Sequence, residues 1–239
     1  MEPENPVECA TRKFASPGVS YGVSMTTNAV IDLSHHNGNI DLGLAKAAGI
    51  LGVIHKATQG SQFKDPLYDS NGAKALEVGL LWGAYHFGDG SDGVSQAEFF
   101  LNAVTPDAST LLVLDFEANP QGPSMNLEEA RAFVTRVHEI TGTWPGLYAG
   151  HYLKDLLGTH TDPVLTNCWL WLSQFGPTPV VPPAWPTWTM WQYTDGALGP
   201  PPHEVTGIGL CDRDIFNGTA TDLAAFWSRA PRAAAAVVP

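Results

Sequence analysis

Hydrophobic positions along the chain occur in short runs that are separated by segments of helical spacing. The runs are rich in Val, Ile, Leu and aromatic residues, which is typical of buried strands. Strands that alternate with crossover helices build a parallel sheet, and eight of them close into an α/β barrel. We therefore predict a single irregular TIM-like (β/α) barrel with fewer than eight helices. Its strands are expected at residues 29–33, 52–57, 80–87, 111–117, 146–150, 168–173, 189–193 and, from a weaker signal, 209–212.

Helical patterns between these runs carry start and stop signals. The first, residues 66–78, has Asp65 as its expected N-cap, Pro66 at the first helical position and Gly79 as its stop. The next crossover helix is expected at residues 94–104.

The clearest helix is residues 127–140. Asn126 and Glu129 have the spacing of a capping box at its start, and Gly142 ends it. After residue 150 the helical signal weakens, and residues 175–186 form a Pro-rich loop. The second half of the barrel is therefore expected to have fewer crossover helices.

Composition indicates one globular domain. Of the 239 residues, 44% are hydrophobic and 15% are charged, so the chain can bury a large core. No Gly/Ser-rich or Pro-rich linker divides its middle, and single barrels occupy about 200 to 250 residues. We expect the barrel at residues 28–228, a poorly ordered extension at 1–27 and a low-complexity tail at 229–239.

Charge and targeting signals exclude several classes of function. The formal net charge is -12 and only 12 residues are Lys or Arg, so a nucleic-acid partner is not expected. No apolar run reaches the roughly 18 to 20 residues that span a bilayer, and residues 1–24 lack the features of a secretory signal. Cys9, Cys168 and Cys211 show no metal-binding spacing and are read as free thiols.

Four acids lie at the ends of the expected strands. Asp32 ends the first strand, Asp115 and Glu117 end the fourth, and Asp212 follows the last apolar pair. In barrel enzymes the chemistry takes place where the strands end at their carboxyl side. Because a buried carboxylate costs several kcal/mol unless it is paired, an accidental cluster of acids there is improbable.

Asp115 and Glu117 are two residues apart, so their side chains project to the same face of a strand, while Phe116 points the other way. Two acids this close shift each other's pKa, so one can stay protonated as a general acid while the other stays anionic. Glycoside hydrolysis needs such a pair. A strand-end pair neutralised by a Lys or by helix N-termini is the structural alternative.

With these acids and their flanking motifs, the sequence resembles the family 25 glycoside hydrolases, which are lysozymes that cleave the muramic acid linkage of peptidoglycan. The resemblance runs from about residue 29 to 227, with the motifs in matching order and spacing. These motifs are IDLSHHNGNIDL (31–42), VIHKATQG (53–60), GLLWGAYHF (79–87), LLVLDFE (111–117), TWPGLYAG (143–150), LWLSQF (170–175), WQYTDG (191–196) and GLCDRDIFNG (209–218).

The resemblance implies cleavage of the β-1,4 bond between N-acetylmuramic acid and N-acetylglucosamine, with no cofactor. Glu117 would be the general acid, and Asp115 would stabilise an intermediate formed by the substrate's own acetamido group, which gives retention of configuration. Asp32 and Asp212 would complete the acidic floor. The implied partner is the peptidoglycan glycan strand, bound by a monomer. The enzyme is expected to act on the cell wall, either after cytoplasmic storage until lysis or after non-classical export.

Aromatic and basic residues are further candidates for substrate binding. Tyr85, Tyr148 and Trp191 lie near strand ends, where their rings could stack on sugars, with core packing as the alternative. Lys56 is expected to pair with a groove acid, and a structural role is equally open. One departure from the family pattern is Gln59, which stands where the strand-two motif usually has a Glu, so we expect altered pH behaviour or binding.

Two other functions remain open from the residues alone. The first is a catalytically silent glycan-binding barrel. The second is a metal-dependent peptidoglycan amidase or deacetylase, because imidazoles and a carboxylate at strand ends can bind zinc. The spacing argues against a metal site, since neither HxH nor HExxH occurs. The residues concerned are His35, His36, His55, His86 and Asp32.

Overall fold

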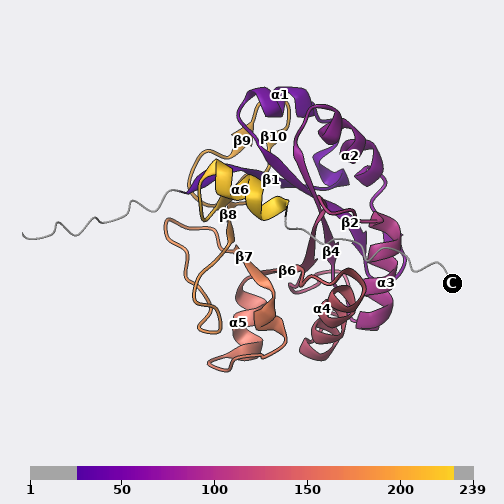
Figure 1. Ribbon diagram of the computed structural model, residues 1–239. Helices are drawn as coiled ribbons and strands as arrows, with labels where there is room; N and C mark the ends of the chain where they lie inside the picture. The colour runs from indigo at the N-terminus through magenta and orange to yellow at the C-terminus, as the bar shows by residue number, and fades with distance from the viewer. Residues whose placement is uncertain (1–25, 229–239) are drawn as a thin grey trace, which may run out of the picture.

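The structure is a computed structural model that describes residues 26–228 (Figure 1). Its centre is a closed barrel of eight strands, in which the pairing of the first strand with the second completes the ring. The strands are β1 (Thr27–Leu33), β2 (Gly52–Gln59), β4 (Leu81–Phe87), β5 (Leu111–Asp115), β6 (Gly146–Ala149), β7 (Trp169–Ser173), β8 (Met190–Thr194) and β11 (Asp212–Phe216). The predicted α/β barrel is confirmed.

The last strand departs from the prediction. Seven strands run parallel to their neighbours in the series from β1 through β2 to β8, but β11 is antiparallel to both β8 and β1. The expected strand at 209–212 is wrong, since Gly209–Leu210 (β10) pairs with Glu204–Val205 (β9) in a separate two-stranded sheet. Because a hairpin and no helix joins β8 to β11, the chain re-enters the barrel from the end it has just left.

This reversal determines the end of the barrel at which the first residue of β11 lies. A strand that enters at the carboxyl end of its neighbours places its first residue there. Asp212 begins β11 and lies opposite Asp32 in the β1–β11 register. The sequence prediction therefore put Asp212 at the correct end of the barrel for the wrong reason.

Six α-helices occur in residues 26–228, so the expectation of fewer than eight is confirmed. Figure 1 shows α2, α3, α4 and α5 around the outside of the barrel. No helix lies between β7 and β8 within the described chain. The helices are α1 (Leu42–Ala47), α2 (Tyr68–Glu77), α3 (Gly93–Val104), α4 (Leu127–Thr141), α5 (His151–Leu157) and α6 (Ala220–Trp227), with short 3-10 turns at His35–Asn37 and Leu165–Asn167 and a two-residue strand β3 (Phe63–Lys64).

Two helix starts test the capping predictions. At α4 the Asn126 side chain accepts from the backbone N–H groups of the first turn, and Glu129 accepts from the Asn126 N–H, so the capping box is confirmed. At α2 the prediction is wrong, because the helix begins two residues after Pro66 and has no side-chain cap. Asp65 instead accepts from the Leu67 N–H and from His35.

The pleat of each barrel strand separates two hydrophobic layers. One alternate set of side chains faces outward into the layer beneath the helices, as Leu112, Leu114 and Phe116 do along β5. The other set faces into the barrel, as Leu111 and Val113 do. This parity carries past the end of β5, so Asp115 and Glu117 both face inward.

Helix α6 closes the amino-terminal end of the barrel. Trp227 is buried, and its indole N–H donates to the carbonyl of Trp82 at 2.9 Å. Its ring lies against Gly52 and Gly83, where an added Cβ would approach the ring to 3.0 and 3.3 Å. The barrel is therefore plugged by apolar side chains at this end and open at the other, which holds the acids.

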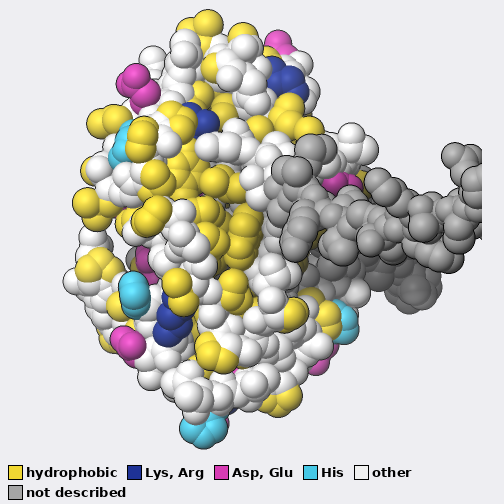
Figure 2. Space-filling view, turned by 90° about the vertical axis from the view of Figure 1, so that its left-hand side faces the viewer, with side chains coloured by type: hydrophobic (Ala, Val, Ile, Leu, Met, Phe, Trp, Pro, Cys, Tyr) yellow, Lys and Arg dark blue, Asp and Glu magenta, His cyan; other side chains and the backbone are white. Residues whose placement is uncertain are grey.

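The face that carries the β7–β8 segment and the β9–β10 hairpin is rich in hydrophobic side chains (Figure 2). Three of its large apolar residues, Val180, Leu198 and Leu210, are more than half exposed. Loops take the place of crossover helices on this side of the barrel.

The boundaries predicted for the terminal segments fall largely outside the described residues, which begin at residue 26 and end at 228. The barrel itself starts with β1 at Thr27, one residue before the predicted boundary. Among residues 26–228, no helix is both long and apolar enough to cross a membrane.

Candidate active site

A cavity of about 260 Å³ lies at the end of the barrel where the parallel strands terminate. Side chains from seven of the strands or the segments directly after them line it. It holds all four acids predicted from the sequence, two tyrosines, one tryptophan and one glutamine. The lining residues are Asp32, Tyr85, Asp115, Glu117, Tyr148, Trp171, Phe175, Gln192, Asp195 and Asp212.

The strand geometry explains why the acids meet. Asp32 comes from β1 and Asp212 from the adjoining antiparallel strand, where the two are register partners. Asp115 is the last residue of β5, and Glu117 lies just beyond it with the same inward parity. Phe116 is fully buried in the outer layer and packs against Tyr152, as predicted.

We call Asp32, Asp115, Glu117 and Asp212 together the acid floor of the cavity. A chain of hydrogen bonds orients one of these acids, Asp32. The Gln192 amide donates to the Asp32 carboxylate at 2.8 Å. The Tyr148 hydroxyl donates to the Gln192 carbonyl at 2.7 Å and lies 2.8 Å from the Ser173 hydroxyl. Three strands, β6, β7 and β8, thus orient the Asp32 carboxylate.

Asp214 is a fifth acid that the sequence reasoning missed. It is fully buried on β11, two residues after Asp212 and on the same face. Its Oδ1 atom accepts from the Trp171 indole N–H at 2.7 Å, and its Oδ2 atom has no hydrogen-bond partner among residues 26–228. Asp212 and Asp214 are two residues apart on one strand, as Asp115 and Glu117 are. Asp214 was not predicted, because the last strand was expected at residues 209–212.

Burial and mutual repulsion shift the pKa values of the central pair. Burial and then the charge of Glu117 raise the pKa of Asp115 well above its usual range. Burial also raises the pKa of Glu117, against the opposing charge of Lys56. The pair therefore holds a proton at a pH where free carboxyl groups have lost theirs.

The other three acids are coupled in the same way. Burial raises the pKa of Asp212 to about 7, with the charges of Asp195 and Glu117 adding to the shift. Burial and the neighbouring carboxylates Asp212 and Asp214 raise the pKa of Asp32, and burial does the same for Asp214.

Two carboxylate oxygens of the buried acids have no partner. Asp115 Oδ1 and Asp214 Oδ2 are buried and make no hydrogen bond to any group of residues 26–228. A buried acceptor without a donor costs about 1–3 kcal/mol. These two oxygens therefore add to the cost of burying the acids in the barrel.

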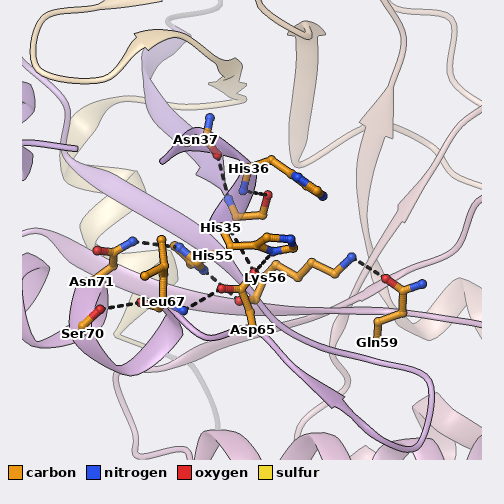
Figure 3. A network of polar contacts seen from close by, with 11 residues as sticks. His35, His36, Asn37, His55, Lys56, Gln59, Asp65, Leu67, Ser70 and Asn71 are labelled. Atoms are coloured by element: carbon orange, nitrogen blue, oxygen red, sulfur yellow. Dashed lines mark hydrogen bonds and ion pairs between the residues drawn. The ribbon is translucent and has the colours of Figure 1, made fainter. Parts of the chain in front are cut away.

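Lys56 lies beside the acid cavity and not in an ion pair. It is buried and lines an adjoining cavity of about 600 Å³, which shares Glu117 with the first. Figure 3 shows its side chain extended to Gln59, whose amide oxygen accepts from Nζ at 2.7 Å. The expected pairing of Lys56 with a groove acid is wrong, because Nζ bonds to the Gln59 amide in place of a carboxylate. Burial lowers the pKa of Lys56, and the charges of Asp115, Asp65 and Glu117 oppose that shift.

The three aromatic residues that were predicted to bind substrate do not all face the interior of the barrel. Tyr85 and Tyr148 line the acid cavity, where burial raises the pKa of both phenols far above their usual range, so both remain hydrogen-bond donors. Trp191 does not line it. This residue faces outward on β8, in the hydrophobic layer under the loops, and its N–H donates to the Gln174 carbonyl. The ring that does line the cavity is Trp171.

The histidines do not converge on a metal site. His55 and His86 are fully buried on the outward faces of their strands, bonded to Asn71 and to Thr58 and Gln96 respectively. His35 is held by Asp65. Within residues 26–228, no three His, Cys, Asp or Glu side chains lie close enough together to hold a metal ion.

The fold and this floor define a class of protein: a barrel enzyme with a buried, partly protonated carboxyl pair in a concave site, as acid-catalysed glycoside hydrolysis requires. The sequence model of the glycosyl hydrolases family 25 matches residues 31–199. The chain belongs to this family, and it is a glycosidase.

Several characterised proteins are similar to the chain along most of its length. Lysozyme M1 of Streptomyces globisporus is 32% identical over 217 residues, which cover 82% of this chain and 69% of that protein. The N,O-diacetylmuramidase of Chalaropsis sp is 30% identical over 69% of this chain and 86% of its own. Among solved structures, a bacterial lysozyme from Streptomyces coelicolor is 31% identical with a TM-score of 0.74, covering 84% of this chain and 98% of that one.

Proposed function

We propose that the protein is a lysozyme that hydrolyses the β-1,4 bond between N-acetylmuramic acid and N-acetylglucosamine in peptidoglycan. The observation that carries the proposal is the meeting of Asp32, Asp115, Glu117 and Asp212 in one cavity. The similarity to lysozymes and muramidases from bacteria and fungi supports the choice of substrate. The partner is the glycan strand, bound by a monomer that acts on the cell wall.

Glu117 acts as the general acid. It lies at the junction of the two cavities, so a glycosidic oxygen that passes from one to the other comes within its reach. Its raised pKa keeps the proton available, and the transfer of that proton to the oxygen accompanies cleavage of the bond between the oxygen and the anomeric carbon.

Asp115 stabilises an intermediate that the substrate forms itself. The acetamido oxygen attacks the anomeric carbon as the leaving group departs, and the amide nitrogen becomes positive and keeps its proton. The Asp115 carboxylate, which lines the cavity, accepts this N–H. Water then attacks the anomeric carbon from the face that the leaving group left, the bond from that carbon to the acetamido oxygen breaks and restores the neutral amide, and Glu117 accepts the proton of the water. Two inversions give net retention of configuration.

The remaining floor residues position these groups. The Gln192 amide holds the Asp32 carboxylate, and Asp212 lies opposite Asp32. Tyr85 and Tyr148 supply hydroxyl groups at the wall of the cavity, where a sugar hydroxyl or acetamido group would lie.

Digestion of purified peptidoglycan tests this function. We expect new reducing ends on N-acetylmuramic acid, identified by mass spectrometry after reduction, and a first-formed β-anomer in a time-resolved NMR experiment. A silent glycan-binding barrel would bind the polymer and release nothing. A metal-dependent amidase would release peptides in place of glycan fragments and would lose activity on addition of a chelator.

A further inference from the structure

The cavity beside the acid floor gathers the basic side chains of this part of the barrel. It measures about 600 Å³ and is lined by His35, His36 and Lys56 together with amide and phenyl groups. The chain as a whole carries a net charge of -12. We call this cavity the Lys56 pocket.

The Lys56 ammonium group has hydrogen-bonding capacity to spare. An ammonium group has three N–H donors, and the one bond that Nζ makes within residues 26–228 is to the neutral amide oxygen of Gln59. Its Nζ also lies 4.8 Å from the centre of the Phe87 ring. Lys56 is 8% exposed and has no direct carboxylate partner among the described residues. Two N–H donors of its ammonium group are therefore left for a ligand.

The imidazole of His35 forms a fixed wall of the same pocket. Its Nδ1 atom lies 2.7 Å from the Asp65 carboxylate, which also accepts from the His35 backbone N–H (Figure 3). The His36 ring lies against it at 4.0 Å between centres. Phe63 links the two sides, at 5.6 Å from the His35 ring and 5.9 Å from the Lys56 Nζ atom.

Two acids, Asp89 and Glu117, border the pocket. The Asp89 Oδ1 atom accepts from the Ser91 backbone N–H and hydroxyl group within its own loop. Neither acid forms an ion pair with Lys56, whose Nζ atom bonds to Gln59. The remaining N–H donors of Lys56 therefore stay available to an anionic ligand.

We propose that the Lys56 pocket is a subsite for a carboxylate carried on the 3-O-lactyl side chain of muramic acid. The carboxylate is the lactyl group's own where the strand has no peptide, or one of the peptide's where it has. The inference rests on the proposed function, because only a muramic acid substrate brings such a group next to Glu117. Two N–H donors of Lys56 form charge-assisted hydrogen bonds to it, and the His35 imidazole closes the wall.

Three glycan substrates with identical backbones test the proposal: strands with the free lactyl carboxylate, strands with the same carboxylate capped as a methylamide, and strands with the intact peptide. For the wild type, we expect kcat/KM for at least one carboxylate-bearing strand to exceed that for the capped strand about tenfold, the order of one charge-assisted hydrogen bond. The preferred strand identifies the source of the carboxylate.

Two variants and one control separate recognition from a general loss of activity. Lys56→Met removes the donors, and Gln59→Glu supplies a carboxylate that occupies them and repels a second one. Both are expected to bring the ratio between carboxylate-bearing and capped strands close to one. Lys74→Met makes the same charge change at an exposed position on α2 and is expected to keep the wild-type ratio.

The outcomes are distinguishable. Equal rates on all three strands for the wild type would overturn the subsite, as would a ratio that survives in both Lys56→Met and Gln59→Glu. If Lys56 only stabilises the floor, its replacement lowers all three rates equally. If the wild type cleaves none of the strands, the proposed function itself is wrong.

Discussion

The chemistry of the site depends on where a proton resides at single carboxyl groups. Asp115 and Glu117 repel each other in a buried place, and Lys56 is the cation that opposes the resulting rise in pKa. Lys56 therefore lowers the pH at which the general acid loses its proton, against the effect of burial. Since the pair is coupled, its two protons leave in steps that belong to both groups.

The substitution Lys56→Met is expected to shift the pH profile of kcat. Removal of the positive charge lets the pKa of Glu117 rise further, so the acid stays protonated to a higher pH. We expect the alkaline limb of the kcat profile to move upward by up to about one unit. The measurement is initial rate against pH at saturating substrate, with Lys74→Met as the unshifted control. A limb that stays in place or moves to lower pH would show that the charge of Lys56 does not act on Glu117.

Residue-level prediction from the sequence succeeded where a single strand with clear alternation carried the information. Asp115 and Glu117 were correctly placed on one face because the LLVLDFE run fixes its own parity. Trp191 was misplaced because both faces of its strand carry large apolar side chains, and only the closed barrel determines which face is the interior. Its neighbour Gln192, the polar residue of that strand, is the one that turns to the cavity.

At the scale of elements, the barrel is built from local signals that act independently. The strand runs and the α4 capping box could be read directly, and the structure has them where they were expected. The antiparallel entry of β11 could not, because it follows from a hairpin that replaces a crossover helix. The start of α2 was predicted wrongly, because the Asp65 carboxylate accepts from the Leu67 N–H before the helix and from His35, 30 residues away, and does not cap the first turn.

The α4 helix offers a test of local stabilisation away from the active site. Asn126 accepts from two backbone N–H groups that no other group satisfies. Its replacement in Asn126→Ala is expected to lower the free energy of unfolding by about 1 kcal/mol and to leave kcat unchanged. Chemical denaturation monitored by circular dichroism gives the first quantity. A change within error of zero would mean that the cap contributes nothing beyond the packing of α4.

At the scale of the whole molecule, burial of the acids lowers the free energy of unfolding by an amount that depends on pH. Asp212 has an ordinary pKa of 3.8 and a pKa of about 7 in the folded protein. Between these values the folded state binds more protons than the unfolded state, so this group makes the protein less stable as pH rises through the window. Below about pH 4 both states are protonated and the cost is absent.

We therefore expect Asp212→Asn to raise the melting temperature by several degrees at pH 8 and to change it little at pH 4. Each unit of raised pKa corresponds to about 1.4 kcal/mol, and one kcal/mol shifts the melting temperature of a domain this size by roughly 2–4 °C. Differential scanning calorimetry of both proteins at both pH values makes the comparison. Equal effects at the two pH values, or a lower melting temperature at pH 8, would refute the idea that the charge of Asp212 is a burden on the fold.

The proposed chemistry requires one residue of the site to deliver a proton to the glycosidic oxygen. The decisive variant is Glu117→Gln, which keeps the size and hydrogen-bonding reach of the side chain and removes its acidity. We predict that it cleaves peptidoglycan at least about 100-fold more slowly than the wild type, as counted by new muramic acid reducing ends, with an unchanged melting temperature at acidic pH. A variant that cleaves within a few-fold of the wild-type rate would contradict the assignment of Glu117 as the general acid.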